Sequence, residues 1–339
     1  MIFCLTQQET RVREVSRMKR ILSLSAALAF SLLLGGLVVP AFSPLLAQEA
    51  AFDGPATIVT LDPKGKDELA APVPATAVKV KVNGKDAKVT SWNAYGPNAT
   101  QPNLQLVLLI DDGARSSLGL HLQEMQRFIT QQLPTTEVAV IYMRNGTAAF
   151  TEPFTTNHEQ AAQALRLPIS GGGAGSSPYF ALSDLMKRWP AHTPGERREV
   201  VTVTDGIDRY NGLRYDPSNP YINATIRDAI RNQVVIYAIY FHNAGFADRT
   251  GAGINSGQNY LTQMCAAVGG DFFFQGFGNP VDFTPYLDQI NRKLGNQYEL
   301  RIEPPAGAKN IVNLKVQVSA PNTKTQVAQQ IFVGPGGGQ

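Results

Sequence analysis

Residues 104–117 read LQLVLLIDDGARSS, a nearly unbroken apolar run that ends in two aspartates. Strands of a parallel sheet are covered on both faces, and they therefore have continuous apolar runs rather than alternating ones. The run 104–110 is predicted to be a buried central strand. Asp111 and Asp112 then lie at its carboxyl end, which is where an open α/β sheet places its ligand site.

Short apolar strands and amphipathic helices continue to alternate on the carboxyl side of this stretch. Strands are predicted over residues 138–143, 148–154, 200–204, 234–241 and 271–274. Only Asn145 and Gly146 separate the first two, a spacing typical of an antiparallel hairpin, whereas strands separated by helices pair in parallel. Residues 104–295 are thus predicted to form a doubly wound α/β domain, with a mostly parallel six-stranded sheet and one antiparallel edge strand.

In the segments on either side of this domain, apolar and polar residues alternate with a period of two. In residues 77–103, valines alternate with lysines before Asn83-Gly84, and this pattern indicates a β-hairpin. Residues 296–334 contain three further runs of this kind. Three strands are too few for a stable independent sheet, so we expect them to pack with residues 77–92 as a small β module.

The remaining segments have the composition of a targeting signal and of connecting chain. In residues 1–47, basic residues precede the apolar run 21–39 and a stretch of small residues, which predicts a signal peptide, with an uncleaved membrane anchor as the alternative. A start at Met18 gives a more ordinary signal. Residues 48–76 are predicted to be a flexible linker and residues 335–339 a disordered tail. The protein is therefore expected to be exported, to the periplasm or to the extracellular envelope.

The net positive charge of the chain comes from the predicted signal peptide. The full sequence has 30 basic and 27 acidic residues, and residues 1–47 contain five and two of them, which leaves 25 of each. A neutral mature protein without a basic face is not expected to bind nucleic acid. Its single remaining cysteine, Cys265, excludes a disulfide within the mature chain.

The order of four motifs is similar to that of the von Willebrand factor A family over about 190 residues. LIDDGARSS ends the first strand, an Asn-Gly turn leads to the edge strand, a Gly-Ser loop opens a helix, and VVTVTDG ends the fourth strand. The resemblance implies a Rossmann-like domain that binds proteins through its loop face. It also implies a site for Mg²⁺ or Mn²⁺ with Asp111 and Asp205 as carboxylate ligands, and with Ser176 or Ser177 in place of a threonine.

The sequence departs from that metal site at two positions, because Gly113 and Arg115 stand where the family has two serines. Mg²⁺ requires oxygen ligands in a near-octahedral arrangement, and neither residue supplies a side-chain oxygen. We therefore expect weak or absent metal binding, with Arg115 neutralising Asp111 or Asp205. The alternative is a site shifted by one residue, in which Asp112 and Ser116 serve as ligands.

The loop after the fourth strand has the composition of a protein interface, where tyrosine and arginine are common anchors. We predict a partner-binding surface that includes residues from this loop and from the first loop: Asp112, Arg115, Arg209, Tyr210, Arg214 and Tyr215. The alternative is that the aromatic side chains only attach long loops to their own domain.

Several catalytic patterns are absent from the sequence. The glycine-rich segment 171–175 is not followed by the lysine of a nucleotide-binding loop, and the chain contains neither a His-Glu-x-x-His motif nor a Gly-x-Ser-x-Gly elbow. The sequence thus favours an exported adhesion or scaffolding module over an enzyme, with a protein or an envelope polymer as its partner. The alternative is a metal-dependent hydrolase with an Asp111/Asp205 cleft.

Overall fold

The computed structural model describes residues 54–65, 71–95, 104–169, 177–190, 196–244 and 250–334, all within the compact unit Ala50–Gln339. The predictions for residues 1–47 and 335–339, and the candidate ligand Ser176, lie outside the described residues. Within the described ranges, no helix combines the length and apolar character needed to cross a bilayer.

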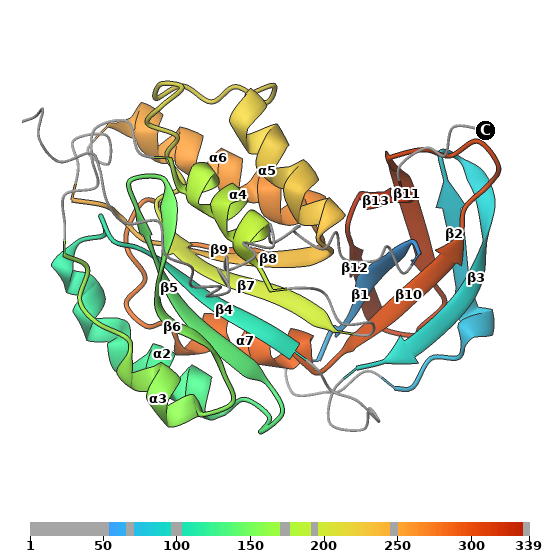
Figure 1. Cartoon of the computed structure of the whole chain (residues 1–339), viewed down its shortest axis with the longest axis horizontal. Helices are drawn as coiled ribbons and strands as arrows, with labels where there is room; N and C mark the ends of the chain where they lie inside the picture. The colour runs from blue at the N-terminus through green and yellow to red at the C-terminus, as the bar shows by residue number, and fades with distance from the viewer. Residues whose placement is uncertain are drawn as a thin grey trace, which may run out of the picture. The chain divides into compact units, whose positions relative to one another are not determined.

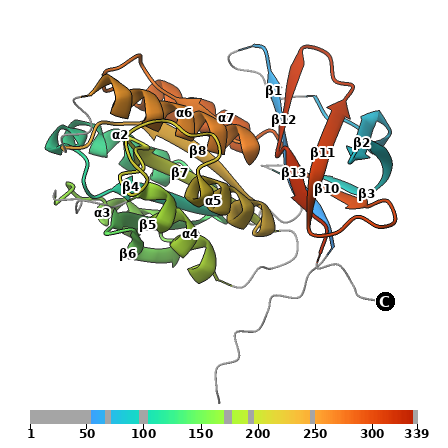
Figure 2. The same ribbon diagram turned by 90° about the horizontal axis from the view of Figure 1, so that it is seen from above.

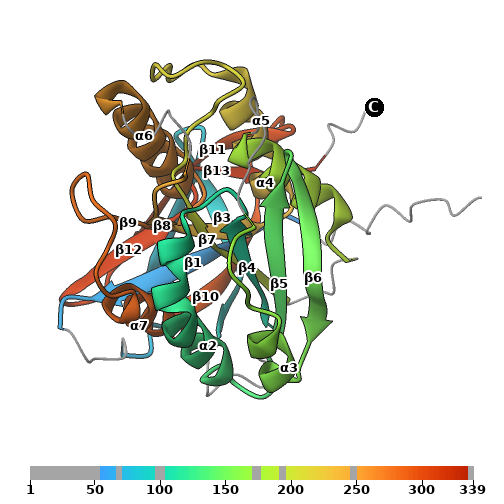
Figure 3. The same cartoon turned by 90° about the vertical axis from the view of Figure 1, so that its left-hand side faces the viewer.

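Six strands form a mixed sheet in the order β6-β5-β4-β7-β8-β9 (Figure 1). They are β4 (Leu104–Asp111), β5 (Glu137–Arg144), β6 (Thr147–Thr155), β7 (Arg197–Thr204), β8 (Val234–Tyr240) and β9 (Phe272–Phe273). All neighbours are parallel except β5 and β6, and Figure 3 shows β6 at the edge beside β5. This sheet has the doubly wound arrangement that the sequence predicts.

Helices cover both faces of this sheet (Figure 1). They are α2 (Leu122–Thr130), α3 (His158–Gln163) and α7 (Thr284–Leu294) on one face, and α4 (Pro178–Arg188), α5 (Pro220–Arg231) and α6 (Gly251–Ala267) on the other. Short 3-10 helices are η1 (Ala75–Ala77) and η2 (Ser116–His121). Alternate residues of β4 enter the two cores, with Leu106 and Leu108 in one and Val107 and Leu109 in the other. Burial on both faces explains why β4 has no polar face in its sequence.

A second sheet has seven antiparallel strands in the order β12-β1-β10-β3-β2-β11-β13 (Figure 2). They are β1 (Ala56–Pro63), β2 (Val78–Val82), β3 (Lys85–Ala94), β10 (Gln297–Glu303), β11 (Ile311–Val318), β12 (Thr323–Val327) and β13 (Gln330–Phe332). The hairpin β2–β3 pairs with β11 and β10, as the sequence suggests. Its turn places Asn83 and Gly84 at φ of 48° and 80°, a conformation that favours Asn-Gly.

The prediction of a flexible linker over residues 48–76 is wrong for β1. This strand pairs with β10 on one side and β12 on the other. Ile58 enters a core of the α/β domain, while Val59 and Leu61 enter the core of the seven-stranded sheet. Burial on both faces removes the alternation that marks a strand. The third C-terminal run is also divided into β12 and β13, so the module contains seven strands instead of five.

Buried charged side chains connect the two sheets. The ammonium of Lys293 on α7 is 2.6 Å from Asp62 Oδ2 of β1 and 3.1 Å from Asp271 Oδ2, and it donates to Gln326 Oε1 of β12 at 2.7 Å. Arg197 of β7 donates to Gln297 Oε1 of β10 at 2.6 Å. Because both cations are almost fully buried, these contacts specify how the seven-stranded sheet attaches to the α/β domain.

Candidate functional site

The candidate site lies where the order of the six strands reverses, between β4 and β7. The connections from these neighbouring strands leave toward opposite faces of the sheet, and the carboxyl ends of strands at such a point are the usual place of a ligand site in an open α/β sheet. Asp111 is the last residue of β4, and Asp205 follows β7 directly. The fold therefore brings together the two carboxylates that the sequence selects.

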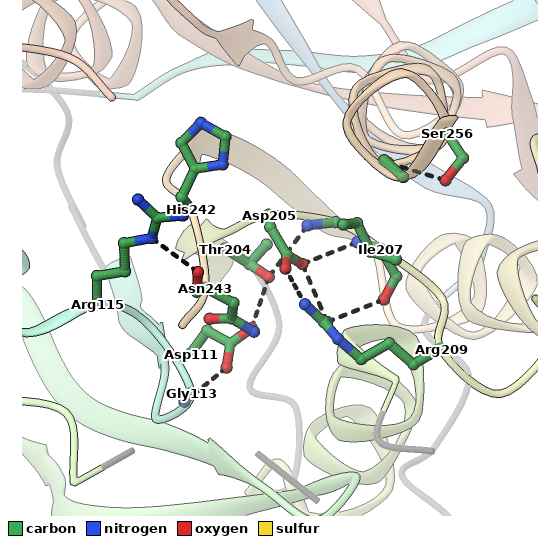
Figure 4. A network of polar contacts seen from close by, with 12 residues as sticks. Asp111, Gly113, Arg115, Thr204, Asp205, Ile207, Arg209, His242, Asn243 and Ser256 are labelled. Carbon is green, nitrogen blue, oxygen red and sulfur yellow. Dashed lines mark hydrogen bonds and ion pairs between the residues drawn. The ribbon is translucent and has the colours of Figure 1, made fainter. Parts of the chain in front are cut away.

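Hydrogen bonds from three groups occupy the carboxylate of Asp111. Its Oδ1 accepts from the Gly113 amide at 2.9 Å, and its Oδ2 accepts from Thr204 Oγ1 at 3.0 Å and from Asn243 Nδ2 at 3.1 Å (Figure 4). Burial raises the pKa of Asp111, while the Gly113 amide and the charge of Arg209 oppose that rise. The donors replace the water that this buried group has lost.

Asp205 is fully buried and is paired with Arg209. The guanidinium donates to both carboxylate oxygens, and the Ile207 amide donates to Oδ1 at 2.9 Å (Figure 4). Only 14% of the Arg209 side chain is exposed. A two-point contact of this kind is among the stronger charge-assisted hydrogen-bond arrangements in proteins, so Asp205 has its counter-ion within the same loop.

The expectation that Arg115 neutralises Asp111 or Asp205 is wrong. Its Nε donates to the Asn243 carbonyl at 3.0 Å, and its amide donates to the His242 carbonyl at 3.2 Å (Figure 4). Arg115 therefore joins the loop after β4 to the loop after β8. The cation at the two aspartates is Arg209, which the sequence analysis assigned to the partner-binding surface.

The described residues do not fit a site for Mg²⁺ or Mn²⁺. A methyl group added at Gly113 would lie 3.1 Å from both Asp111 Oδ1 and Asn243 Nδ2, so the amide of Asn243 takes the space beside the glycine. Asn243 turns its N–H group, not its oxygen, toward Asp111. Within the described ranges, no three His, Cys, Asp or Glu side chains form a group suited to a metal. Donors and a guanidinium thus surround carboxylates that an ion would need as ligands.

Ser177, the described hydroxyl nearest to the expected threonine position, does not complete a ligand set. It is buried at the N-cap of α4, where its Oγ makes no capping hydrogen bond and has no partner among the described residues. Ser116 is exposed within η2, so the shifted site with Ser116 as a ligand has no support either.

Close packing by α6 fixes the loop that carries Asp205. A Cβ at Gly257 would lie 2.1 Å from the Asp205 carbonyl oxygen. Gly206 has a φ of +68°, and a Cβ there would lie 2.5 Å from Leu261 Cγ. A glycine is therefore required directly after Asp205, because the backbone at Gly206 is left-handed and packs closely against α6.

Asp112 does not belong to the exposed surface on which the sequence analysis placed it. Its side chain is buried, and its oxygens accept hydrogen bonds from Arg144, Arg166 and the Ile169 amide. Burial raises the pKa of Asp112, but these three donors outweigh burial and hold the pKa below its usual value. The carboxylate therefore orients two arginines that the sequence did not reveal as neighbours.

The loop after β7 presents the remaining predicted contact residues. Arg214 and Tyr215 are exposed, and Tyr210 is 58% exposed. The ring of Tyr210 also packs edge to face against Phe180 and Tyr221, at centroid distances of 5.2 and 5.1 Å. These aromatic residues thus attach the loop to α4 and α5 and still leave surface for a partner.

Apolar residues on other loops at this end of the sheet escaped the sequence analysis. In the described part of the chain, the exposed large hydrophobic side chains besides the two tyrosines are Leu120, Leu167, Ile169, Phe274, Phe277 and Val281. Three of them follow β9, and His242 holds that loop against β8 by donating from Nε2 to the Phe277 carbonyl at 2.6 Å. Except for Phe274, which ends the predicted strand 271–274, their signal in the sequence is an apolar residue outside the apolar positions of any predicted strand or helix.

Neither a protein-family model nor a curated protein sequence matches the chain. Among solved structures, a von Willebrand factor type A protein from Catenulispora acidiphila is similar at 11% identity and a TM-score of 0.43, over 84% of this chain and 74% of that one. The strand order of the α/β domain is the doubly wound order that the resemblance to the von Willebrand factor A family leads us to expect.

Two further structures resemble the von Willebrand factor A-like domain. They are the conserved hypothetical protein BatB from Bacteroides thetaiotaomicron (15% identity, TM-score 0.40) and an aerotolerance-related membrane protein from Bacteroides fragilis (12%, 0.38). Each comparison covers 57% of this chain and 98% of the other chain. At these identities the likeness concerns the fold alone.

Proposed function

We propose that the chain is an exported adhesion or scaffolding protein whose loop face contacts a partner without a divalent ion. The loop face is defined here as the loops at the carboxyl ends of the six-stranded sheet. The observation that carries the proposal is the collection of exposed apolar and aromatic side chains on these loops. Its partner is a protein or an envelope polymer.

The apolar side chains that support the proposal are well exposed and lie on loops at the same end of the sheet. Leu120 after β4 is 79% exposed, and Phe277 and Val281 after β9 are 69% and 84% exposed. Exposed apolar side chains that gather on one face favour an interaction site, because burial against a partner removes their contact with water. The gathering of such residues at one end of the sheet supports a binding role for that end.

The neutralised carboxylates support the ion-independent part of the proposal. Arg209 balances Asp205, and Asp111 is hydrogen-bonded by Gly113, Thr204 and Asn243. An added cation would compete with these donors for the carboxylate oxygens. The site therefore stabilises the loop face from within.

Export is proposed from the composition of residues 1–47, and it places the partner in the periplasm or at the cell surface. The balanced charge beyond residue 47 gives no electrostatic reason to expect a nucleic acid. An uncleaved signal would hold the domain at the membrane, and N-terminal sequencing of the protein from the envelope distinguishes the two forms.

The contacts at the site do not favour the hydrolase alternative. General acid–base chemistry needs a carboxylate within reach of the substrate, whereas Asp205 is fully buried against Arg209. Two hollows among the described residues, of about 720 and 400 Å³, are lined by other residues. We expect no turnover in a phosphatase and glycosidase screen with Mg²⁺; activity that Asp205→Asn abolishes would support the hydrolase.

Crosslinked capture from the envelope of the source organism tests the proposal. The Leu120→Ser/Phe277→Ser/Val281→Ser variant, called the loop-face triple variant, replaces exposed side chains and should keep its fold. A Lys81→Ala/Lys315→Ala variant changes the seven-stranded sheet and serves as the control. We expect a partner that wild type and control capture and that the triple variant loses. Equal capture by all three proteins would refute a role for the loop face.

A further inference from the structure

Two arginines converge on the single carboxylate of Asp112 at the rim of the loop face. Arg144, at the end of β5, donates to Asp112 Oδ2 from Nε at 3.1 Å and from Nη2 at 2.9 Å. Arg166, in the segment after α3, donates from Nη1 to Oδ1 at 2.7 Å and from Nη2 to Oδ2 at 3.1 Å. Two guanidinium groups are thus balanced by one carboxylate.

This arrangement leaves one positive charge and several N–H groups available. Among the described residues, Arg144 Nη1 and Arg166 Nε donate to no acceptor. The side chains of Arg144 and Arg166 are 48% and 32% exposed, whereas that of Asp112 is 5% exposed. The buried carboxylate therefore orients the arginines, and their outer edges face solvent.

Packing holds Arg166 in place before any ligand arrives. Its guanidinium carbon lies 3.8 Å from the centroid of the Tyr142 ring. The Tyr142 hydroxyl accepts from the Arg166 amide at 2.8 Å and donates to the Arg166 carbonyl at 2.7 Å. A guanidinium fixed in this way loses little conformational freedom on binding, and this raises the affinity that each new hydrogen bond supplies.

Apolar side chains border the same arginines. The Ile169 amide donates to Asp112 Oδ1 at 3.1 Å, and the Leu167 carbonyl accepts from Arg166 Nη1 at 2.9 Å. Leu167 also lies against Gly119, where an added methyl group would come within 2.5 Å of its Cδ2, and Gly119 directly precedes the exposed Leu120. A cationic edge and an apolar surface are therefore adjacent.

We propose that the Arg144–Arg166 pair binds an aspartate or glutamate side chain of a partner protein whose neighbouring residues are apolar. The inference rests on the proposed function and assigns the chemistry of the partner at one edge of the loop face. A planar guanidinium matches a carboxylate through two parallel hydrogen bonds. The single uncompensated charge suits one carboxylate, and the apolar border of Leu120, Leu167 and Ile169 suits a peptide segment.

Selection of displayed random peptides on the intact wild-type chain provides a probe. The best binder is synthesised with its acidic residue and with the corresponding amide, and its affinity is measured by fluorescence anisotropy for wild type, Arg144→Gln and Arg231→Gln. Arg231 is the matched control, because it is 51% exposed on α5 and lies 3.9 Å from Asp228. Thermal unfolding and circular dichroism establish that each variant is folded.

We expect the selected peptides to contain an acidic residue beside apolar ones. Arg144→Gln should lower the affinity about ten- to a hundredfold, since hydrogen bonds to charged groups contribute that much, and Arg231→Gln should leave it unchanged. The amide peptide should bind wild type more weakly than the acidic peptide does. Arg144→Gln should weaken the binding of the amide peptide only a little further.

Peptides without acidic residues, equal binding by Arg144→Gln, or no selected peptide would each overturn the inference. If acid-free peptides bind wild type but not the loop-face triple variant, the inference fails and the proposed function stands. If acid-free peptides bind the loop-face triple variant as tightly as wild type, both the inference and the proposed function fail.

Discussion

Arg209→Leu is expected to destabilise the protein by leaving a buried carboxylate without its counter-ion. Asp205 has no exposed surface, and in the variant it keeps the Ile207 amide as a donor at 2.9 Å. Removal of one partner of a buried ion pair costs about 3–5 kcal/mol. Because Arg209 is partly exposed and the Ile207 amide still donates to Asp205, we place the loss of unfolding free energy at about 3 kcal/mol. This loss corresponds to a Tm lower by roughly 6–12 °C.

Urea unfolding followed by tryptophan fluorescence measures this loss. Asp205→Asn added to Arg209→Leu should recover part of the stability, because the amide is neutral and does not need a cation. Arg214→Leu, an exposed arginine of the same loop, is the control and should change stability by less than about 0.5 kcal/mol. A loss with Arg209→Leu no larger than that of the control would refute the assignment of Arg209 as the counter-ion.

Three further outcomes follow from the buried contacts. Burial raises the pKa of Glu199 from 4.5 to about 8. The folded protein therefore holds a proton that the unfolded chain releases between these values, and stability should fall as the pH rises through this window, by up to about 1.4 kcal/mol per pH unit. Urea titrations at several pH values should show a smaller slope for Glu199→Gln, and an unchanged slope would contradict the assignment. Lys293→Met should cost about 1–3 kcal/mol in the same assay, because it leaves Asp62 and Asp271 without their buried cation while their partial exposure lets water reach them, and a neutral effect would show that the charge is dispensable. Gly257→Ala should lower stability by about 1–3 kcal/mol, since its Cβ would lie 2.1 Å from the Asp205 carbonyl oxygen; an unchanged Tm would show that α6 adjusts freely.

Local patterns predict the six-stranded sheet because each of its strands is an apolar run between helices or turns. The Asn145-Gly146 turn identifies the antiparallel edge strand by its backbone geometry, with φ of 51° and 74°. β1 has no such local mark. It is buried on both faces, and both of its partners, β10 and β12, come from the other end of the chain.

In the candidate site, too, local sequence patterns predict some features, whereas contacts between distant segments are not predicted. Asp111 and Asp205 are recognisable because a carboxylate that ends a buried strand needs a partner. The sequence does not say which arginine supplies the charge, since this depends on whether the loop turns Arg115 or Arg209 inward. The pairing of Asp112 with Arg144 and Arg166 joins three separate segments, and no local pattern encodes it.

The ion dependence of partner capture tests the central claim most directly. Wild type and the loop-face triple variant are compared in chelator and in buffer with Mg²⁺ or Mn²⁺. Because Arg209 already serves as the cation at Asp205, wild type should capture equal amounts of partner under both conditions, and the triple variant should capture none under either. Capture that chelator abolishes and Mn²⁺ restores would contradict the account.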